Sequence, residues 1–116
     1  MTVRQAIDAI GVLASGGLDS SILVGQMLRQ GRRVQPIYIR TGLHWQAGEL
    51  PALTRFLAAV ATEHLAELVT LDLPLADLYS DHWSLTGSAI PGVDSPDEAV
   101  YLPGRNALLI VKAAVW

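Results

Sequence analysis

The chain has 116 residues, which is enough for one domain but not for two. Apolar residues make up 51% of it, so we expect a buried core rather than a disordered chain. Its formal charge of −3 provides no basic surface that would make nucleic acid an expected partner. Cysteine is absent, which excludes a disulfide, a thiolate zinc ligand and a cysteine nucleophile within this chain. No apolar run is long enough to cross a bilayer and the start does not resemble a signal peptide, so we expect a cytoplasmic protein.

The first two thirds of the chain alternate between strand and helix patterns. Three segments are rich in apolar, β-branched or aromatic residues and are predicted strands: 9–14, 34–40 and 68–73. Two segments between them have helical spacing of apolar residues and are predicted helices: 20–30 and 47–64. Short strand-helix-strand connections predict an α/β fold, with a parallel sheet covered by helices on both faces.

The spacing of apolar residues supports the predicted helices, whereas one proline argues against the second predicted strand. Leu23 and Met27 are four residues apart in the first predicted helix, and we expect them on its buried face. In the second predicted helix, four apolar residues share one face: Leu50, Leu53, Leu57 and Val60. We expect His64 near the end of that helix. Pro36 is an objection to the second strand, because proline removes a hydrogen-bond donor from the sheet.

The last third is organised differently. Residues 74–104 contain four prolines and no sustained period, and a connection of this length is usually functional. An apolar helix is then predicted from Asn106 to Trp116, without a glycine or polar tail to close it. We therefore expect a single domain, over 1–116, that is incomplete at its C-terminus. Exposed as it stands, this helix would promote self-association into a homo-oligomer, and we expect the piece to be inactive alone.

The strongest chemical signal is Ser15-Gly16-Gly17-Leu18-Asp19-Ser20-Ser21, between the first predicted strand and the first predicted helix. Anions bind at this place in open α/β sheets, outside a strand's carboxyl end and before a helix N-terminus. The glycines bring backbone N–H groups close to a phosphate, and the serines add hydroxyl donors. Asp19 beside a phosphate suggests Mg²⁺. The alternative is an ordinary turn in which Asp19 caps the helix.

This stretch resembles the Ser-Gly-Gly-x-Asp-Ser loop of the ATP-pyrophosphatase (PP-loop) superfamily, whose members activate a substrate with ATP through an adenylate. The resemblance implies an adenine nucleotide alpha hydrolase-like, Rossmann-like fold that uses ATP and Mg²⁺. It assigns Asp19 to the metal and Asp19 and Ser20 to catalysis. The residues that it implies for nucleotide binding are Ala14, Ser15, Gly16, Gly17, Leu18, Asp19, Ser20, Ser21, Arg40 and Gly42.

A second segment, Tyr101-Leu102-Pro103-Gly104-Arg105-Asn106, resembles the Val-Pro-Gly-Arg-Asn segment of the 7-cyano-7-deazaguanine synthase family. That resemblance implies a ligase of queuosine biosynthesis, which converts 7-carboxy-7-deazaguanine and ammonia into the nitrile. Arg105 suits a phosphate or a carboxylate, because its planar guanidinium forms two parallel hydrogen bonds, and we expect it to be catalytic. Asn106 is expected to cap the following helix. A Pro-Gly turn with a helix cap is the alternative, and it leaves Arg105 without a role.

The resemblance is partial. After its second strand the family has a Tyr-Gly-Gln segment with a basic pair, whereas this chain reads Arg40-Thr41-Gly42-Leu43-His44-Trp45. His44 and Trp45 are candidates for contact with adenine or substrate, and Asp81-His82-Trp83 is a candidate for the substrate pocket. The family's four zinc-binding cysteines lie nearer its C-terminus, so zinc remains an open question. Two other functions remain: another ATP-pyrophosphatase, such as an amidotransferase or tRNA-modifying ligase, and a module that binds adenine nucleotides without catalysis.

Overall fold

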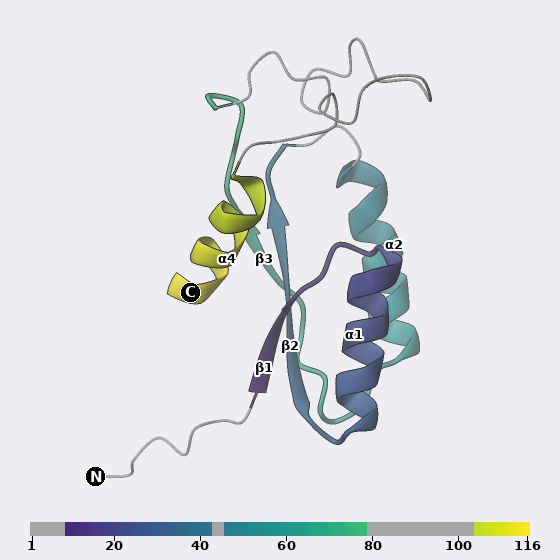
Figure 1. Cartoon of the computed structure of the whole chain (residues 1–116). Helices are drawn as coiled ribbons and strands as arrows, with labels where there is room; N and C mark the ends of the chain where they lie inside the picture. The colour runs from purple at the N-terminus through teal and green to yellow at the C-terminus, as the bar shows by residue number, and fades with distance from the viewer. Residues whose placement is uncertain (1–8, 43–45, 79–103) are drawn as a thin grey trace, which may run out of the picture.

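The computed structural model describes residues 9–42, 46–78 and 104–116, and these form three strands and three helices (Figure 1). In chain order, the elements are β1 (Ala9–Leu13), α1 (Leu18–Arg29), β2 (Arg33–Arg40), α2 (Gln46–Ala59), β3 (Val69–Asp72) and α4 (Arg105–Val115). Each strand and each helix that the sequence predicts is present among these residues. No helix in these ranges is long and apolar enough to span a membrane.

The strands form one sheet in the order β1-β2-β3, and both neighbouring pairs are parallel. The register places Leu13 opposite Ile37 and Arg40 opposite Asp72, so the carboxyl ends of the strands meet at one edge. α1 and α2 cover one face of the sheet, whereas α4 lies on the other (Figure 1). The prediction of an α/β fold with a parallel sheet and helices on both faces is therefore confirmed.

The core lies between the sheet and the helices α1 and α2. Its buried members come from these two helices and from the sheet face toward them: Val12, Ala14, Val24, Val34, Tyr38, Leu53 and Leu57. The predicted face of α2 is confirmed, since Leu50 and Val60 pack against this cluster. In α1 the prediction is half wrong, because Leu23 is 43% exposed while its neighbour Val24 is fully buried. The buried face of α1 is centred on Val24, with Met27 and Leu28 one turn later.

Pro36 is tolerated inside the central strand because a side chain replaces the missing ladder contact. The chain after α2 first pairs with β2 at a single bridge between Val34 and Leu65, and β3 proper begins only at Val69. Between these points the Gln35 side chain reaches across and donates from Nε2 to the carbonyl oxygens of Pro36 (3.0 Å) and Glu67 (2.9 Å). The gap in the pairing lies where proline removes a donor.

The second helix is shorter than its sequence predicts. It ends at Ala59, and His64 lies in a turn outside it, so both the predicted end and the helical placement of His64 are wrong. The cause is a long-range constraint, because the His64 carbonyl accepts the N–H of Val34 at 2.9 Å. The chain must leave the helix to bring this carbonyl beside β2. Thr62 supports the turn by accepting the N–H of His64 at 3.1 Å.

Candidate functional site

The loop between β1 and α1 is held together by two of its own serines. Ser20 Oγ accepts the N–H of Ser15 at 3.2 Å and donates to the Gly17 carbonyl at 3.3 Å. Ser15 Oγ accepts the N–H of Gly17 at 3.2 Å and lies 3.3 Å from Ser20 Oγ. The two hydroxyls therefore shape the backbone of the loop. They connect its start to the first turn of α1.

Gly16 lets this loop lie against α2. Its φ of +82° belongs to the left-handed region, which disfavours side chains. A Cβ at this position would lie 3.1 Å from the Glu49 carbonyl oxygen and 3.4 Å from the backbone nitrogen of Leu53. Both conditions require glycine, so the loop and α2 pack backbone to backbone.

Replacing Gly16 with alanine is expected to destabilise the protein by about 2 kcal/mol, because it adds left-handed strain to a close contact with a carbonyl oxygen. If the loop binds a nucleotide, as we propose below, its displacement should also weaken ATP binding roughly tenfold, which corresponds to about 1.4 kcal/mol. Urea unfolding and calorimetric titration with ATP measure these two effects. The matched control is Gly25→Ala in α1, where an added Cβ meets nothing within 4 Å. That control should gain up to about 1 kcal/mol, and a Gly16 variant that behaves like it would contradict the prediction.

The first turn of α1 contains backbone donors that the helix itself does not pair. Gly17 is the N-cap residue, and the helix makes its first hydrogen bond from the Ser21 N–H to the Gly17 carbonyl at 3.1 Å. The N–H groups of Leu18, Asp19 and Ser20 precede that bond, so the helix itself supplies no acceptor for them. Such a turn attracts anions. Asp19 lies inside this turn, two residues after the N-cap, so the alternative in which Asp19 is the N-cap is wrong.

A cavity of about 350 Å³ lies where β1 and β2 end. It brings together residues that are far apart in the sequence. Its lining includes Ala14 and Ser15 from the loop, Tyr38 from β2, Gln46 and Glu49 from α2, and Arg105 and Asn106 from α4. Three of the predicted site residues, Ala14, Ser15 and Arg105, thus share one cavity. Tyr38, Gln46 and Glu49 were not predicted as site residues, because in the sequence Gln46 and Glu49 look like ordinary polar residues at the start of a helix.

Arg105 is the first residue of α4 and lines this cavity together with Ser15 of the loop between β1 and α1. The N-cap position belongs to Gly104, so the expectation that Asn106 caps the helix is wrong; Asn106 lies within the first turn. Arg105 is half-buried, and its Nε has no hydrogen-bond partner among the described residues. A buried guanidinium nitrogen without an acceptor suits an anionic ligand.

Tyr38 and Glu49 form a polar pair in the same cavity. The Tyr38 hydroxyl donates to Glu49 Oε2 at 3.2 Å. Burial raises the pKa of the Tyr38 phenol far above its ordinary value, and the neighbouring Glu49 carboxylate raises it further. The phenol therefore stays protonated at neutral pH and remains a donor, which orients the Glu49 carboxylate.

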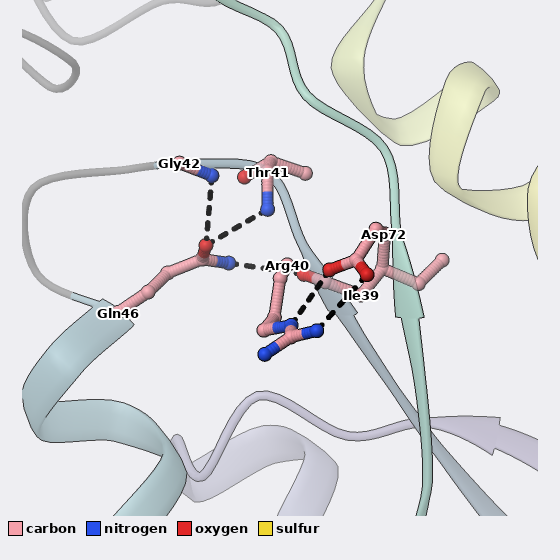
Figure 2. Close-up of polar contacts among 6 residues, drawn as sticks. All are labelled: Ile39, Arg40, Thr41, Gly42, Gln46 and Asp72. Atoms are coloured by element: carbon pink, nitrogen blue, oxygen red, sulfur yellow. Dashed lines mark hydrogen bonds and ion pairs between the residues drawn. The ribbon is translucent and has the colours of Figure 1, made fainter.

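Gln46 fixes the segment that follows β2 (Figure 2). Its Oε1 accepts the N–H groups of Thr41 at 2.8 Å and Gly42 at 3.1 Å, and its Nε2 donates to the Ile39 carbonyl at 3.0 Å. The side chain is buried, and it satisfies three backbone groups at the strand's end. Gly42 has a φ of +82°, which allows the chain to turn there. One side chain at the start of α2 therefore fixes the backbone at the end of β2.

Arg40 and Gly42 lie apart from the cavity that holds Arg105. They border a separate hollow beside Gln46 and Leu50. The Arg40 guanidinium forms two parallel hydrogen bonds with Asp72, from Nε at 2.6 Å and from a terminal nitrogen at 2.9 Å (Figure 2). Nucleotide binding by Arg40 stays a prediction, and it would compete with this ion pair.

The Arg40–Asp72 pair is expected to contribute little to stability, because both side chains are more than half exposed and water and salt screen them. The hydrogen bond from Arg40 lowers the pKa of Asp72. The contribution of the ion pair to stability is therefore present above the pKa of Asp72 in the unfolded chain. It is lost as the pH falls through the lower pKa of Asp72 in the folded protein. We expect Asp72→Asn to move the urea midpoint only slightly at pH 7, and not at all in strong acid. A large shift that persists in acid would contradict this assignment.

The structure says less about the remaining predicted site residues. His44, Trp45 and Asp81-His82-Trp83 lie outside the described residues. Within the ranges that the structure covers, no three His, Asp or Glu side chains gather closely enough to hold a metal ion. Asp19 as a single carboxylate still fits Mg²⁺, which commonly takes one or two protein carboxylates together with phosphate oxygens and water.

Comparison with known proteins identifies the family. The family described as "Queuosine biosynthesis protein QueC" matches residues 9–116. The chain is 30% identical over 108 residues to 7-cyano-7-deazaguanine synthase 1 of Desulfitobacterium hafniense, covering 90% of this chain and 48% of that protein. It is 30% identical over 112 residues to 7-cyano-7-deazaguanine synthase of Desulfotalea psychrophila, covering 93% and 49%. The chain thus spans about half the length of these relatives, and no solved structure matches it. This chain belongs to the QueC family of queuosine biosynthesis proteins.

Proposed function

We propose that the protein carrying this chain is an ATP-dependent ligase of the 7-cyano-7-deazaguanine synthase type. In this proposal ATP activates the carboxylate of 7-carboxy-7-deazaguanine, and ammonia supplies the nitrogen of the nitrile. One observation carries the proposal: a loop suited to phosphates opens onto a cavity that also holds a half-buried arginine, in a chain of the QueC family. Two named 7-cyano-7-deazaguanine synthases among the relatives support it.

In this proposal each of the described residues has a distinct role in binding ATP or the substrate. The N–H groups at the start of α1 bind the phosphates, and Asp19 holds the Mg²⁺ that offsets their charge. Ser20 keeps the loop in shape through its bonds to Ser15 and Gly17. Arg105 holds an anionic group, either a phosphate or the substrate carboxylate. The cavity volume of about 350 Å³ lies within the usual range for small-molecule sites.

The overall reaction sets a requirement on ATP. A nitrile carries neither oxygen of the starting carboxylate, so both must leave. A carboxylate oxygen first attacks the α-phosphorus of ATP and displaces pyrophosphate. Ammonia then attacks the acyl carbon, AMP departs with that oxygen, and a proton is lost to give the amide. Activation of the amide oxygen in the same way, followed by loss of AMP and two protons, leaves the nitrile. One ATP is consumed for each oxygen removed.

The test uses the full-length gene product with 7-carboxy-7-deazaguanine, ammonium and MgATP. Mass spectrometry follows the nitrile while AMP and pyrophosphate are quantified, with each substrate omitted in turn as a control. The proposal predicts AMP and pyrophosphate in equal amounts, both dependent on the carboxylate. Formation of ADP and phosphate instead would contradict it. Nucleotide binding without any pyrophosphate would favour the non-catalytic module.

Replacing Arg105 with lysine is expected to lower kcat/KM roughly tenfold to hundredfold, because lysine keeps the charge but loses the planar pair of donors. The assay above, run over a range of ATP and carboxylate concentrations, shows which substrate's KM rises and so which anion Arg105 holds. The matched control is Arg55→Lys on α2, which lines a different hollow. Equal kcat/KM values in both variants would show that Arg105 does not bind a substrate.

A further inference from the structure

Glu49 is an acidic side chain placed beside a loop suited to phosphates. Its backbone carbonyl lies 3.1 Å from the position of a Cβ on Gly16, so the first turn of α2 touches the loop directly. Its carboxylate is half-buried, lines the cavity and accepts the Tyr38 hydroxyl at 3.2 Å. A carboxylate has about four acceptor positions, so it can accept hydrogen bonds from more than one donor. Close to phosphates, a carboxylate is favourable where hydrogen-bond donors lie between the two negative charges.

The direction in which a bound nucleotide lies determines which part of it is next to Glu49. With its phosphates at the start of α1, the remainder of the molecule extends past Ser15 into the cavity, because Ser15 belongs to both the loop and the cavity lining. The sugar is joined directly to the phosphates, so it would occupy the part of the cavity beside Ser15. Glu49 lines the same cavity. The apolar residues Leu109 and Ile110 lie on the α4 side and suit the flat base.

The two charged side chains of the cavity, Arg105 and Glu49, come from different helices. Arg105 on α4 is a donor for anions, whereas Glu49 on α2 is an acceptor for neutral donors or cations. Apart from the amino group of the base, the donors of ATP are its two ribose hydroxyls. Adjacent hydroxyls are well matched to a carboxylate, and carboxylates in other nucleotide-binding α/β folds contact ribose in this way.

We propose that Glu49, oriented by Tyr38, accepts hydrogen bonds from the ribose hydroxyls of ATP and so makes the site selective for ribonucleotides. The inference rests on the proposed use of ATP and adds the residue that recognises its sugar. Tyr38 is a positioning residue, because it acts through the Glu49 carboxylate.

The experiment measures binding of ATP, 2′-deoxy-ATP and 3′-deoxy-ATP to the full-length protein in the presence of Mg²⁺, with no carboxylate substrate added. The wild type should bind at least one deoxy analogue roughly tenfold or more weakly than ATP, as expected for a hydrogen bond to a charged group. Glu49→Ala should bind ATP and that analogue within about twofold of each other. Tyr38→Phe should give an intermediate ratio. Glu63→Ala, at an 88% exposed carboxylate, is the matched control and should keep the wild-type ratio.

The ratio between nucleotides separates sugar recognition from other effects. If Glu49→Ala weakens ATP and both deoxy analogues equally, Glu49 serves the phosphates, a metal ion or the fold, and the inference is wrong. Glu49→Gln, which preserves the side-chain volume, checks this result, and an unchanged preference for ATP in both variants would also overturn the inference. Absence of ATP binding by the wild type would instead overturn the proposed function. Equal wild-type affinities for all three nucleotides would overturn only the role of Glu49.

Discussion

Replacing Asp19 with alanine is expected to reduce magnesium-dependent pyrophosphate release roughly a thousandfold, because charge stabilisation by a bound metal contributes several kcal/mol to such a reaction. Asp19 lies in the first turn of α1, beside the N–H groups proposed to bind the phosphates. A carboxylate there repels the nucleotide unless a cation lies between them. The measurement is pyrophosphate release over a range of Mg²⁺ concentrations. Asp19→Asn should also need more Mg²⁺ than the wild type.

The loss should not come from unfolding. Asp19 is exposed, and an acidic residue in the first turn of a helix contributes only about 0.3–1 kcal/mol through the helix dipole. Urea unfolding of Asp19→Ala should therefore remain close to that of the wild type. Glu67→Ala, at another exposed carboxylate far along the chain, is the control and should keep full activity. Wild-type turnover by Asp19→Ala would exclude Asp19 from catalysis and from metal binding.

Replacing Gln46 with methionine is expected to lower the free energy of unfolding by about 3–5 kcal/mol. Methionine has a similar length, but it leaves two N–H groups and one carbonyl at the end of β2 without partners, at about 1–3 kcal/mol each before relaxation. This is a large share of the roughly 5–15 kcal/mol by which a domain is usually stable. Urea unfolding of the purified protein measures the change.

A matched glutamine separates burial from the number of hydrogen bonds. Gln35 also donates to two backbone carbonyls, but one of those bonds is exposed to water. Gln35→Met should therefore cost only about 1 kcal/mol, since water can replace the lost contacts. If the two variants lose equal stability, the burial of Gln46 does not account for its contribution. Gln46→Met should also weaken ATP binding, because Gln46 itself lines the cavity.

Local patterns in the sequence determined the elements and the loop. The apolar and β-branched strands and the two glycines before α1 act over a few neighbouring residues, so they can be recognised without knowing the fold. Short strand-helix-strand connections also restrict the sheet to parallel pairing, which the structure confirms. For the same reason, the position of the loop proposed to bind phosphates, at the carboxyl end of β1, followed from the sequence.

The tertiary structure alone decided where α2 ends, which residue caps α4 and which side chains meet in the cavity. α2 ends at Ala59 because the His64 carbonyl pairs with Val34, a contact between distant segments. Gln46 and Glu49 look like ordinary polar residues at the start of a helix. Their roles depend on backbone groups of β2, on Tyr38 and on the close packing at Gly16, and none of these neighbours follows from local sequence. Side-chain partners that come from separate elements are set by packing, and packing is defined only once the sheet and its helices have come together.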